Sequence, residues 1–85
     1  LMALGKFAEA ETLVREALAM RRKLLDAEHK DIAASLNGLG RVLSEQGKFA
    51  EAAEMYRQSL AIHRKLYGED HPFVANSLNN VAAML

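Results

Sequence analysis

The amino-acid sequence predicts an all-α protein, an α-solenoid built from antiparallel helix hairpins, and three observations support this. The chain repeats itself with a period of 42 residues: when residues 1–43 are aligned with residues 43–85, 19 of the 43 pairs are identical. Apolar residues recur at three- and four-residue steps, the spacing of one helix face. One proline and five glycines in 85 residues suit long helices joined by tight turns. A period of this length indicates stacked units, each too small to bury its own apolar face.

The first predicted helix covers about residues 7–25. Acidic Glu9 and Glu11 lie near its start and a basic run, Arg21–Lys23, near its end, an order that complements the helix dipole. The apolar positions of this helix are Phe7, Ala10, Val14, Ala17, Leu18 and Leu24. The stretch that follows, residues 26–30, contains neither glycine nor proline, so we expect a less sharp boundary there.

The second predicted helix covers about residues 30–46. Gly40 lies inside its apolar stripe, where glycine costs roughly 1 kcal/mol of helix propensity against alanine. We therefore expect another helix to cross closely at Gly40. Only Gly47 and Lys48 separate this helix from the next one, so the two must fold back antiparallel.

The third and fourth predicted helices cover about residues 49–67 and 72–85. Between them, Gly68 can adopt a positive φ after the third helix, and Pro72 suits the first turn of the fourth. Asp70 is the expected N-cap of the fourth helix. Ala82 stands one period after Gly40, so a second close crossing is expected there.

Composition excludes several classes of function. Basic and acidic residues balance at 11 each, so the chain lacks the net positive charge typical of proteins that bind nucleic acid or an anionic membrane. Cysteine is absent, which excludes disulfides and thiolate chemistry and leaves the compartment open, with a cytoplasmic location favoured. No serine or threonine stands beside a plausible base, and no phosphate-binding loop or zincin motif is present. We expect no enzyme activity, no cofactor and no metal.

The motif Leu36-x-x-Leu39-Gly40-x-x-Leu43-x-x-x-Gly47-x-Phe49-x-x-Ala52-x-x-x-Tyr56 resembles the tetratricopeptide repeat. The resemblance covers the whole chain. The 42-residue period and the segments Ser77–Ala82, Gln46–Ala52, Ala61–Lys65 and Gly68–Pro72 are similar to the longer form found in kinesin light chains and related bacterial proteins. In the first copy, Asp26 and Lys30 replace the glycine and proline of that loop. The resemblance implies a right-handed superhelix in which helices 30–46 and 72–85 line the concave surface and helices 7–25 and 49–67 lie outside.

The resemblance also implies a protein or peptide partner bound on that concave surface. Asparagine suits such a surface because it both donates and accepts hydrogen bonds, and can therefore bind an extended backbone without requiring a particular side chain. The implied contact positions are Ala34, Asn37, Arg41, Ser44 and Glu45 on one helix and Asn76, Asn79 and Ala83 on the other. The main candidates are Asn37, Arg41, Ser44, Asn76, Asn79 and Ala83.

Simpler interpretations of these residues remain open. The asparagines can be solvated or can join neighbouring helices, and Arg41 can pair with Glu45 at i,i+4. His29 and His71 occupy equivalent loop positions, but their spacing is not that of a metal site, so a structural role is preferred. The rival to peptide binding is a structural segment of a longer array, or a self-assembling scaffold, without a ligand of its own.

The ends of the chain predict self-association. We expect a single solenoid fragment over residues 1–85, with repeat periods 1–42 and 43–84, in which helices 7–25 and 72–85 each lack one neighbour. Their uncovered apolar faces should then stack end to end between copies, because a contact of this type does not close on itself. The expected exposed residues are Phe7, Val14 and Leu18 at one end and Leu78, Val81 and Leu85 at the other.

Overall fold

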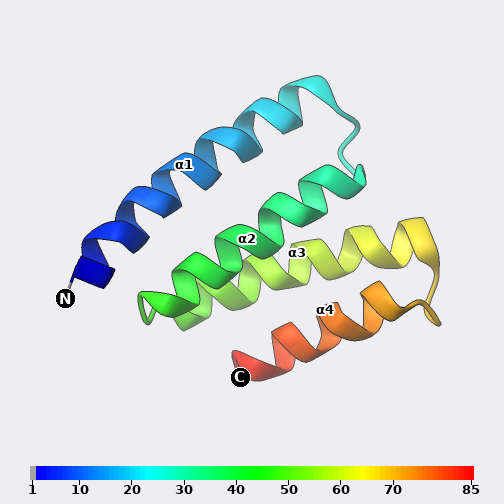
Figure 1. Ribbon diagram of the computed structural model, residues 1–85. Helices are drawn as coiled ribbons and strands as arrows, with labels where there is room; N and C mark the ends of the chain where they lie inside the picture. Colours follow the sequence, from blue (N-terminus) through cyan, green and yellow to red (C-terminus); the bar gives the residue numbers. More distant parts are fainter. Residues whose placement is uncertain (1) are drawn as a thin grey trace.

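The computed structural model describes residues 2–85, and the side chains of residues 5–85, as four helices that follow one another in chain order (Figure 1). The helices are α1 (Met2–Leu24), α2 (Lys30–Glu45), α3 (Phe49–Tyr67) and α4 (Pro72–Ala83). Each packs against its neighbours in sequence: α1 on α2, α2 on α3, and α3 on α4. The predicted all-α arrangement of two helix hairpins is confirmed.

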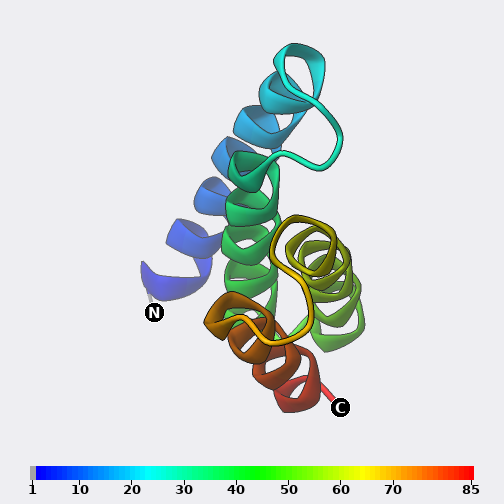
Figure 2. The same ribbon diagram turned by 90° about the vertical axis from the view of Figure 1, so that its right-hand side faces the viewer.

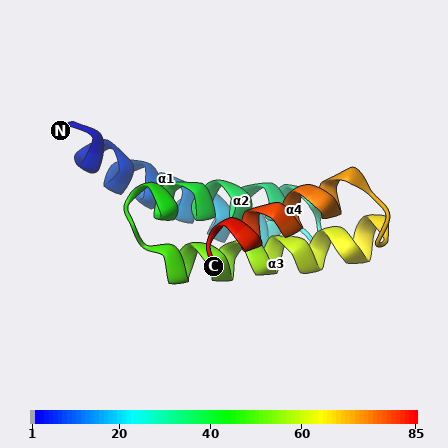
Figure 3. The ribbon, with the colours of Figure 1, turned by 90° about the horizontal axis from the view of Figure 1, so that it is seen from below.

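The helices divide between two sides of the molecule. The α1–α2 and α3–α4 loops lie at one end and the α2–α3 turn at the other (Figure 1). In Figure 2, α3 lies beside α2, and α4 lies below both. The view from below places α2 and α4 together above α3 (Figure 3). Across the described helices, none is both long enough and apolar enough to span a membrane.

The first helix begins earlier than predicted, at Met2 and not near Phe7, and ends at Leu24. The backbone at Gly5 is helical, although Gly47, one period later, lies in the α2–α3 turn with a positive φ.

The turn between α2 and α3 has the hydrogen bonds of a Schellman motif. The Lys48 N–H donates to the Leu43 carbonyl at 2.9 Å, and the Gly47 N–H donates to the Ser44 carbonyl at 3.0 Å. Gly47 has a φ of 81°, a value that residues with a side chain rarely adopt. These bonds satisfy carbonyls at the end of α2 and reverse the chain within three residues.

The loop before α4 confirms one pair of predictions and corrects another. Gly68 has a φ of 82° and Pro72 is in the first turn of α4, as predicted. However, the N-cap of α4 is His71 and not Asp70: the His71 Nδ1 accepts from the Phe73 N–H at 3.1 Å. The last helix also ends at Ala83, two residues before the predicted end.

The equivalent residue before α2, His29, caps that helix in the same way. Its Nδ1 accepts from the Asp31 N–H at 3.0 Å. An aspartate before a helix is usually the better candidate for this role, but before α4 the imidazole of His71, one position after Asp70, accepts the backbone hydrogen bond. The predicted structural role of His29 and His71 is confirmed, and it consists of capping.

The core of the molecule gathers around α2. Its most buried large apolar residues are at most 1% exposed and face α1 and α3: Ile32, Leu36, Leu39 and Leu43. Leu18 of α1 joins this core with 5% exposure, and Val14 packs against it. The expectation that Leu18 belongs to an uncovered face is therefore wrong, because this residue is on the side of α1 that contacts α2.

Gly40 lies at a close helix crossing, as predicted. It is buried, and a Cβ at this position would stand 2.9 Å from the Cε1 of Tyr56 on α3. Ala82, one period later, is exposed, so the second predicted crossing is not formed. The reason is that α3 is the only described helix that α4 contacts, and Ala82 is on the other side of α4.

Glu11 of α1 joins the first helix to the α2–α3 turn. Its carboxylate accepts hydrogen bonds from Gln46 Nε2 at 2.9 Å, from Arg15 Nε at 2.8 Å and from Lys48 Nζ at 3.3 Å. These donors, Gln46 above all, lower the pKa of Glu11 from 4.5 to about 2. The ionised form of Glu11 is therefore favoured in the folded state.

This contact predicts a pH-dependent loss of stability. Because folding lowers the pKa of Glu11, its contribution is complete above pH 4.5 and is lost as the pH falls toward about 2. Glu11→Gln should be less stable than the wild type at neutral pH, and its stability should fall less steeply over that acid range. Urea unfolding at a series of pH values measures both. Parallel curves for the two proteins would show that Glu11 makes no linked contribution.

Candidate functional site

Both hairpin units contain the same polar link between neighbouring helices. In the first unit, the Arg21 Nη1 on α1 donates to the Ser35 Oγ on α2 at 2.8 Å and to the Asp31 carbonyl at 2.9 Å. In the second, 42 residues later, the His63 Nδ1 on α3 lies 2.8 Å from the Ser77 Oγ on α4. The position of the link is kept, while a permanently charged guanidinium is replaced by an imidazole.

The imidazole of His63 lies beside a pocket of ≈ 460 Å³ between the N-terminal halves of α2 and α4. Burial lowers the pKa of His63 below its ordinary value, so the ring is neutral at pH 7. A neutral imidazole has one donor and one acceptor. The lining residues come from α2, α3 and α4: Lys30, Asp31, Ala34, Asn37, His63, Tyr67, Phe73 and Asn76.

One wall of this pocket, which we call the groove pocket, is aromatic. Tyr67 stacks on His71 with ring centroids 4.4 Å apart and meets Phe73 edge to face at 5.3 Å. Phe73 also lies 5.7 Å from His63 and remains 46% exposed. Exposed aromatic rings held in place by their neighbours offer apolar contact area at little entropic cost. The groove pocket therefore combines an aromatic wall with polar groups from α2 and α4.

The structure brings some of the predicted site residues together and separates others. Asn37 on α2 and Asn76 on α4 both line the groove pocket. Further along the same two helices, Arg41, Asn79 and Ala83 are exposed and outside the pocket. No ion pair joins Arg41 to Glu45, although both residues are described.

Two of the candidate side chains differ in hydrogen bonding. The Ser44 Oγ donates to the Arg41 carbonyl of its own helix at 2.8 Å, so its proton is already engaged. The Asn37 Oδ1 is buried and has no hydrogen-bond partner within the described part of the chain. A buried acceptor without a partner costs about 1–3 kcal/mol. A small rearrangement that supplies a hydrogen-bond donor to the Asn37 Oδ1 would therefore remove this cost.

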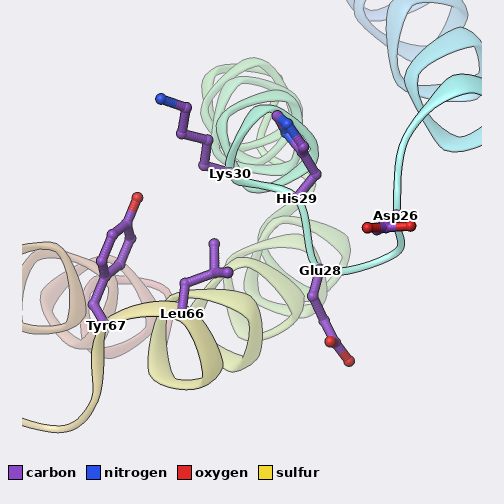
Figure 4. A pocket seen from close by; sticks show the side chains of 6 residues that line it. All are labelled: Asp26, Glu28, His29, Lys30, Leu66 and Tyr67. Atoms are coloured by element: carbon purple, nitrogen blue, oxygen red, sulfur yellow. The ribbon is translucent and has the colours of Figure 1, made fainter.

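A second pocket, of ≈ 400 Å³, lies next to the first, between the α1–α2 loop and the C-terminal end of α3. In Figure 4 the side chain of Tyr67 points from α3 toward the start of α2, where Lys30 lies. Both residues also line the groove pocket, so the two pockets are adjacent. The residues labelled in the figure line the second pocket: Asp26, Glu28, His29, Lys30, Leu66 and Tyr67.

Sequence reasoning missed the aromatic wall. His63, Tyr67 and Phe73 are not among the site residues that the sequence predicts. A signal was available in the sequence. When the two periods are aligned, His63 pairs with Arg21 and Ser77 pairs with Ser35, so both periods have polar residues at the same two positions of an otherwise apolar face. The same alignment pairs Phe73 with a charged residue, Asp31, so the second unit is more aromatic at this position.

No group of three or more metal-ligating side chains lies together in the part of the chain that the structure describes. What the fold defines is a helical-repeat module. A family model for the tetratricopeptide repeat matches residues 1–65 and again residues 46–85, so the two matches together span the chain. The chain belongs to the tetratricopeptide repeat family. Members of this family generally act as protein–protein interaction elements and are typically non-catalytic. No curated protein matches the chain significantly.

Proposed function

We propose that this protein binds an extended peptide segment of a partner protein along the face formed by α2 and α4. The observation that supports the proposal most strongly is the groove pocket, in which asparagines from both helices meet an aromatic wall. Asn76 supplies a donor and an acceptor for a peptide backbone, and Asn37 supplies its amide N–H donors. Tyr67 and Phe73 supply contact area for one apolar side chain of the peptide.

The rest of the binding face continues toward the C-terminal ends of α2 and α4. Asn79 and Ala83 on α4 and Arg41 on α2 are exposed along this path. Arg41 contributes a guanidinium that favours an acidic group in the ligand. Ser44 contributes through its lone pairs, because its proton is bonded to its own helix.

We also infer that the chain has the 42-residue form of the repeat that kinesin light chains use, with periods 1–42 and 43–84. The support is the period itself, together with the Gly68–Pro72 loop and its two matched capping histidines, His29 and His71. The longer period adds residues to each hairpin.

Selection from a random peptide library, followed by fluorescence titration of the selected peptide, tests the proposal. Asn79→Ala should weaken binding by up to about tenfold, since a hydrogen bond contributes about 0.5–1.5 kcal/mol. Its stability should change little, because Asn79 is exposed. Arg41→Glu should weaken the binding of acidic peptides more than that of other peptides.

The matched control is Glu54→Ala, at an exposed position of α3 that lines none of the pockets described above. It should bind every peptide as the wild type does. Equal affinity of the wild type, Asn79→Ala and Arg41→Glu proteins for all peptides would reject the binding face. It would favour the rival function, a structural or self-assembling repeat segment without a ligand of its own.

A further inference from the structure

The face of α1 that points away from α2 carries a stripe of five exposed residues at alternating steps of four and three. We call these residues the α1 stripe: Glu9, Leu13, Glu16, Met20 and Lys23. Leu13 is 59% exposed and Met20 is 61% exposed, and a shallow pocket of ≈ 260 Å³ opens beside Glu16, Met20 and Lys23. Two large apolar side chains that alternate with charged ones are typical of a helix surface that contacts another element.

The 42-residue repeat shows what the same stripe does one unit later. Its counterpart on α3 has the same charges at both ends and apolar residues at the same two positions: Glu51, Met55, Gln58, Ile62 and Lys65. There Ile62 is 8% exposed and Met55 packs against the core. The α3 stripe is therefore covered, whereas the α1 stripe is not.

The polar residues of the α3 stripe bind the preceding unit. Arg15 Nη2 lies 3.5 Å from Glu51 Oε2. Arg22 Nη2 donates to the Gln58 Oε1 at 3.1 Å, and Lys65 Nζ donates to the Glu28 Oε2 at 2.9 Å. The partners on the preceding unit are thus two arginines of α1 and an acid of the α1–α2 loop.

These three partners also recur 42 residues later, as Arg57, Arg64 and Asp70. All three are exposed. The second unit therefore presents the same two arginines and one acid that the α3 stripe binds in the first unit. If the α1 stripe of another molecule occupied the equivalent place, every polar pair would join opposite charges: Arg57 with Glu9, Arg64 with Glu16 and Asp70 with Lys23.

Apolar residues on α4 and just after it extend this match. Leu78 on α4 is 44% exposed, and Leu85, two residues past the end of α4, is 86% exposed. Their counterparts on α2, Leu36 and Leu43, are 1% and 0% exposed because other helices cover them. A helix docked on α4 as α3 is docked on α2 would cover both leucines.

We propose that a second copy of this chain docks head to tail, with its α1 stripe on the α3–α4 unit of the first copy. The three opposite-charge pairs are the argument for a second copy as the occupant. The pair with Arg64 requires one exchange, because the Arg64 Nε now donates to the Glu69 Oε1 at 3.1 Å. The contact uses different surfaces on the two copies, so it continues along an open chain of molecules.

Sedimentation velocity from micromolar to millimolar concentration tests this with two charge-reversed variants. Arg57→Glu/Arg64→Glu reverses one surface, and Glu9→Arg/Glu16→Arg reverses the other. When two copies of the same variant meet, the contact brings like charges together. The dissociation constant should therefore rise about tenfold or more above that of the wild type. An equimolar mixture should associate again, since the two reversed surfaces complement each other.

Recovery in the mixture separates this proposal from simple unfolding, which mixing cannot reverse. The control is Arg41→Glu, outside both docking surfaces, which should associate as the wild type does even where it changes peptide binding. A wild-type chain that stays monomeric throughout, or charge-reversed variants that associate unchanged, would overturn the proposal. The α1 stripe would then be a surface for another repeat or another protein, and the peptide-binding proposal would stand unaffected.

Discussion

Gly40→Leu should lower the free energy of unfolding by about 1–3 kcal/mol, because it overpacks a closed interior. The Cβ alone would stand 2.9 Å from the Tyr56 Cε1, and Tyr56 is only 7% exposed, so its ring has little room to move. Urea denaturation followed by circular dichroism measures the change. The same crossing should make even Gly40→Ala destabilising, although alanine is the better helix former.

Gly38 in the same helix provides the matched control. A Cβ at Gly38 would meet nothing within 4 Å. Gly38→Ala should therefore raise the free energy of unfolding by roughly 0.5–1 kcal/mol through helix propensity alone. Opposite signs for alanine at positions two residues apart identify the crossing with α3 as the cause. If Gly40→Ala stabilised the protein as Gly38→Ala does, the close approach of Tyr56 would not constrain the fold.

Leu36→Ala should have a larger effect, a loss of about 2–5 kcal/mol, because it leaves a cavity in the core around α2. Leu36 is 1% exposed and packs in the cluster with Ile32 and Leu39. A loss of this size is a large share of the stability of a domain of 85 residues. We expect the urea midpoint to fall steeply, with part of the population unfolded in the absence of urea.

The equivalent substitution one period later is Leu78→Ala. Leu78 occupies the same place in the repeat but is 44% exposed. Measured at low concentration, Leu78→Ala should cost under about 1 kcal/mol, because most of its surface is already in water. Equal losses for Leu36→Ala and Leu78→Ala would mean that α4 is covered as completely as α2 is.

Most of the fold is predictable from the repeat. The 42-residue period and the apolar spacing give the number of helices, and three of the four helix starts agree with the structure. The start of α1 could not be predicted in this way. The sequence at Gly5 repeats that of the turn at Gly47, but the backbone at Gly5 is helical, so the local sequence alone does not decide the conformation. Burial cannot be predicted from the repeat alone either, because Ala82 occupies the position of Gly40 one period later and is exposed, whereas Gly40 is buried.

The candidate site is predictable in part. Asn37 and Asn76 were expected on one face, and both line the groove pocket. The aromatic wall was missed because Tyr67 follows helical spacing, which does not distinguish a covered ring from an exposed one, and because Phe73 lies outside the apolar stripe of its helix. The capping histidine was also missed, since Asp70 and His71 are adjacent and only the backbone geometry decides which side chain reaches the Phe73 N–H.

The packing of each helix on its sequence neighbours has a consequence for how the chain folds. Among the described helices, the pairs whose backbones pack closely are consecutive in sequence, so none of these pairs requires the chain to close a loop longer than one hairpin. Folds with such local contacts form quickly compared with those that pair distant segments. During synthesis, which releases the amino terminus first, α3 can add to the surface of α2 and α4 to that of α3 as each leaves the ribosome. The order in which the helices are translated is thus also an order in which they can assemble.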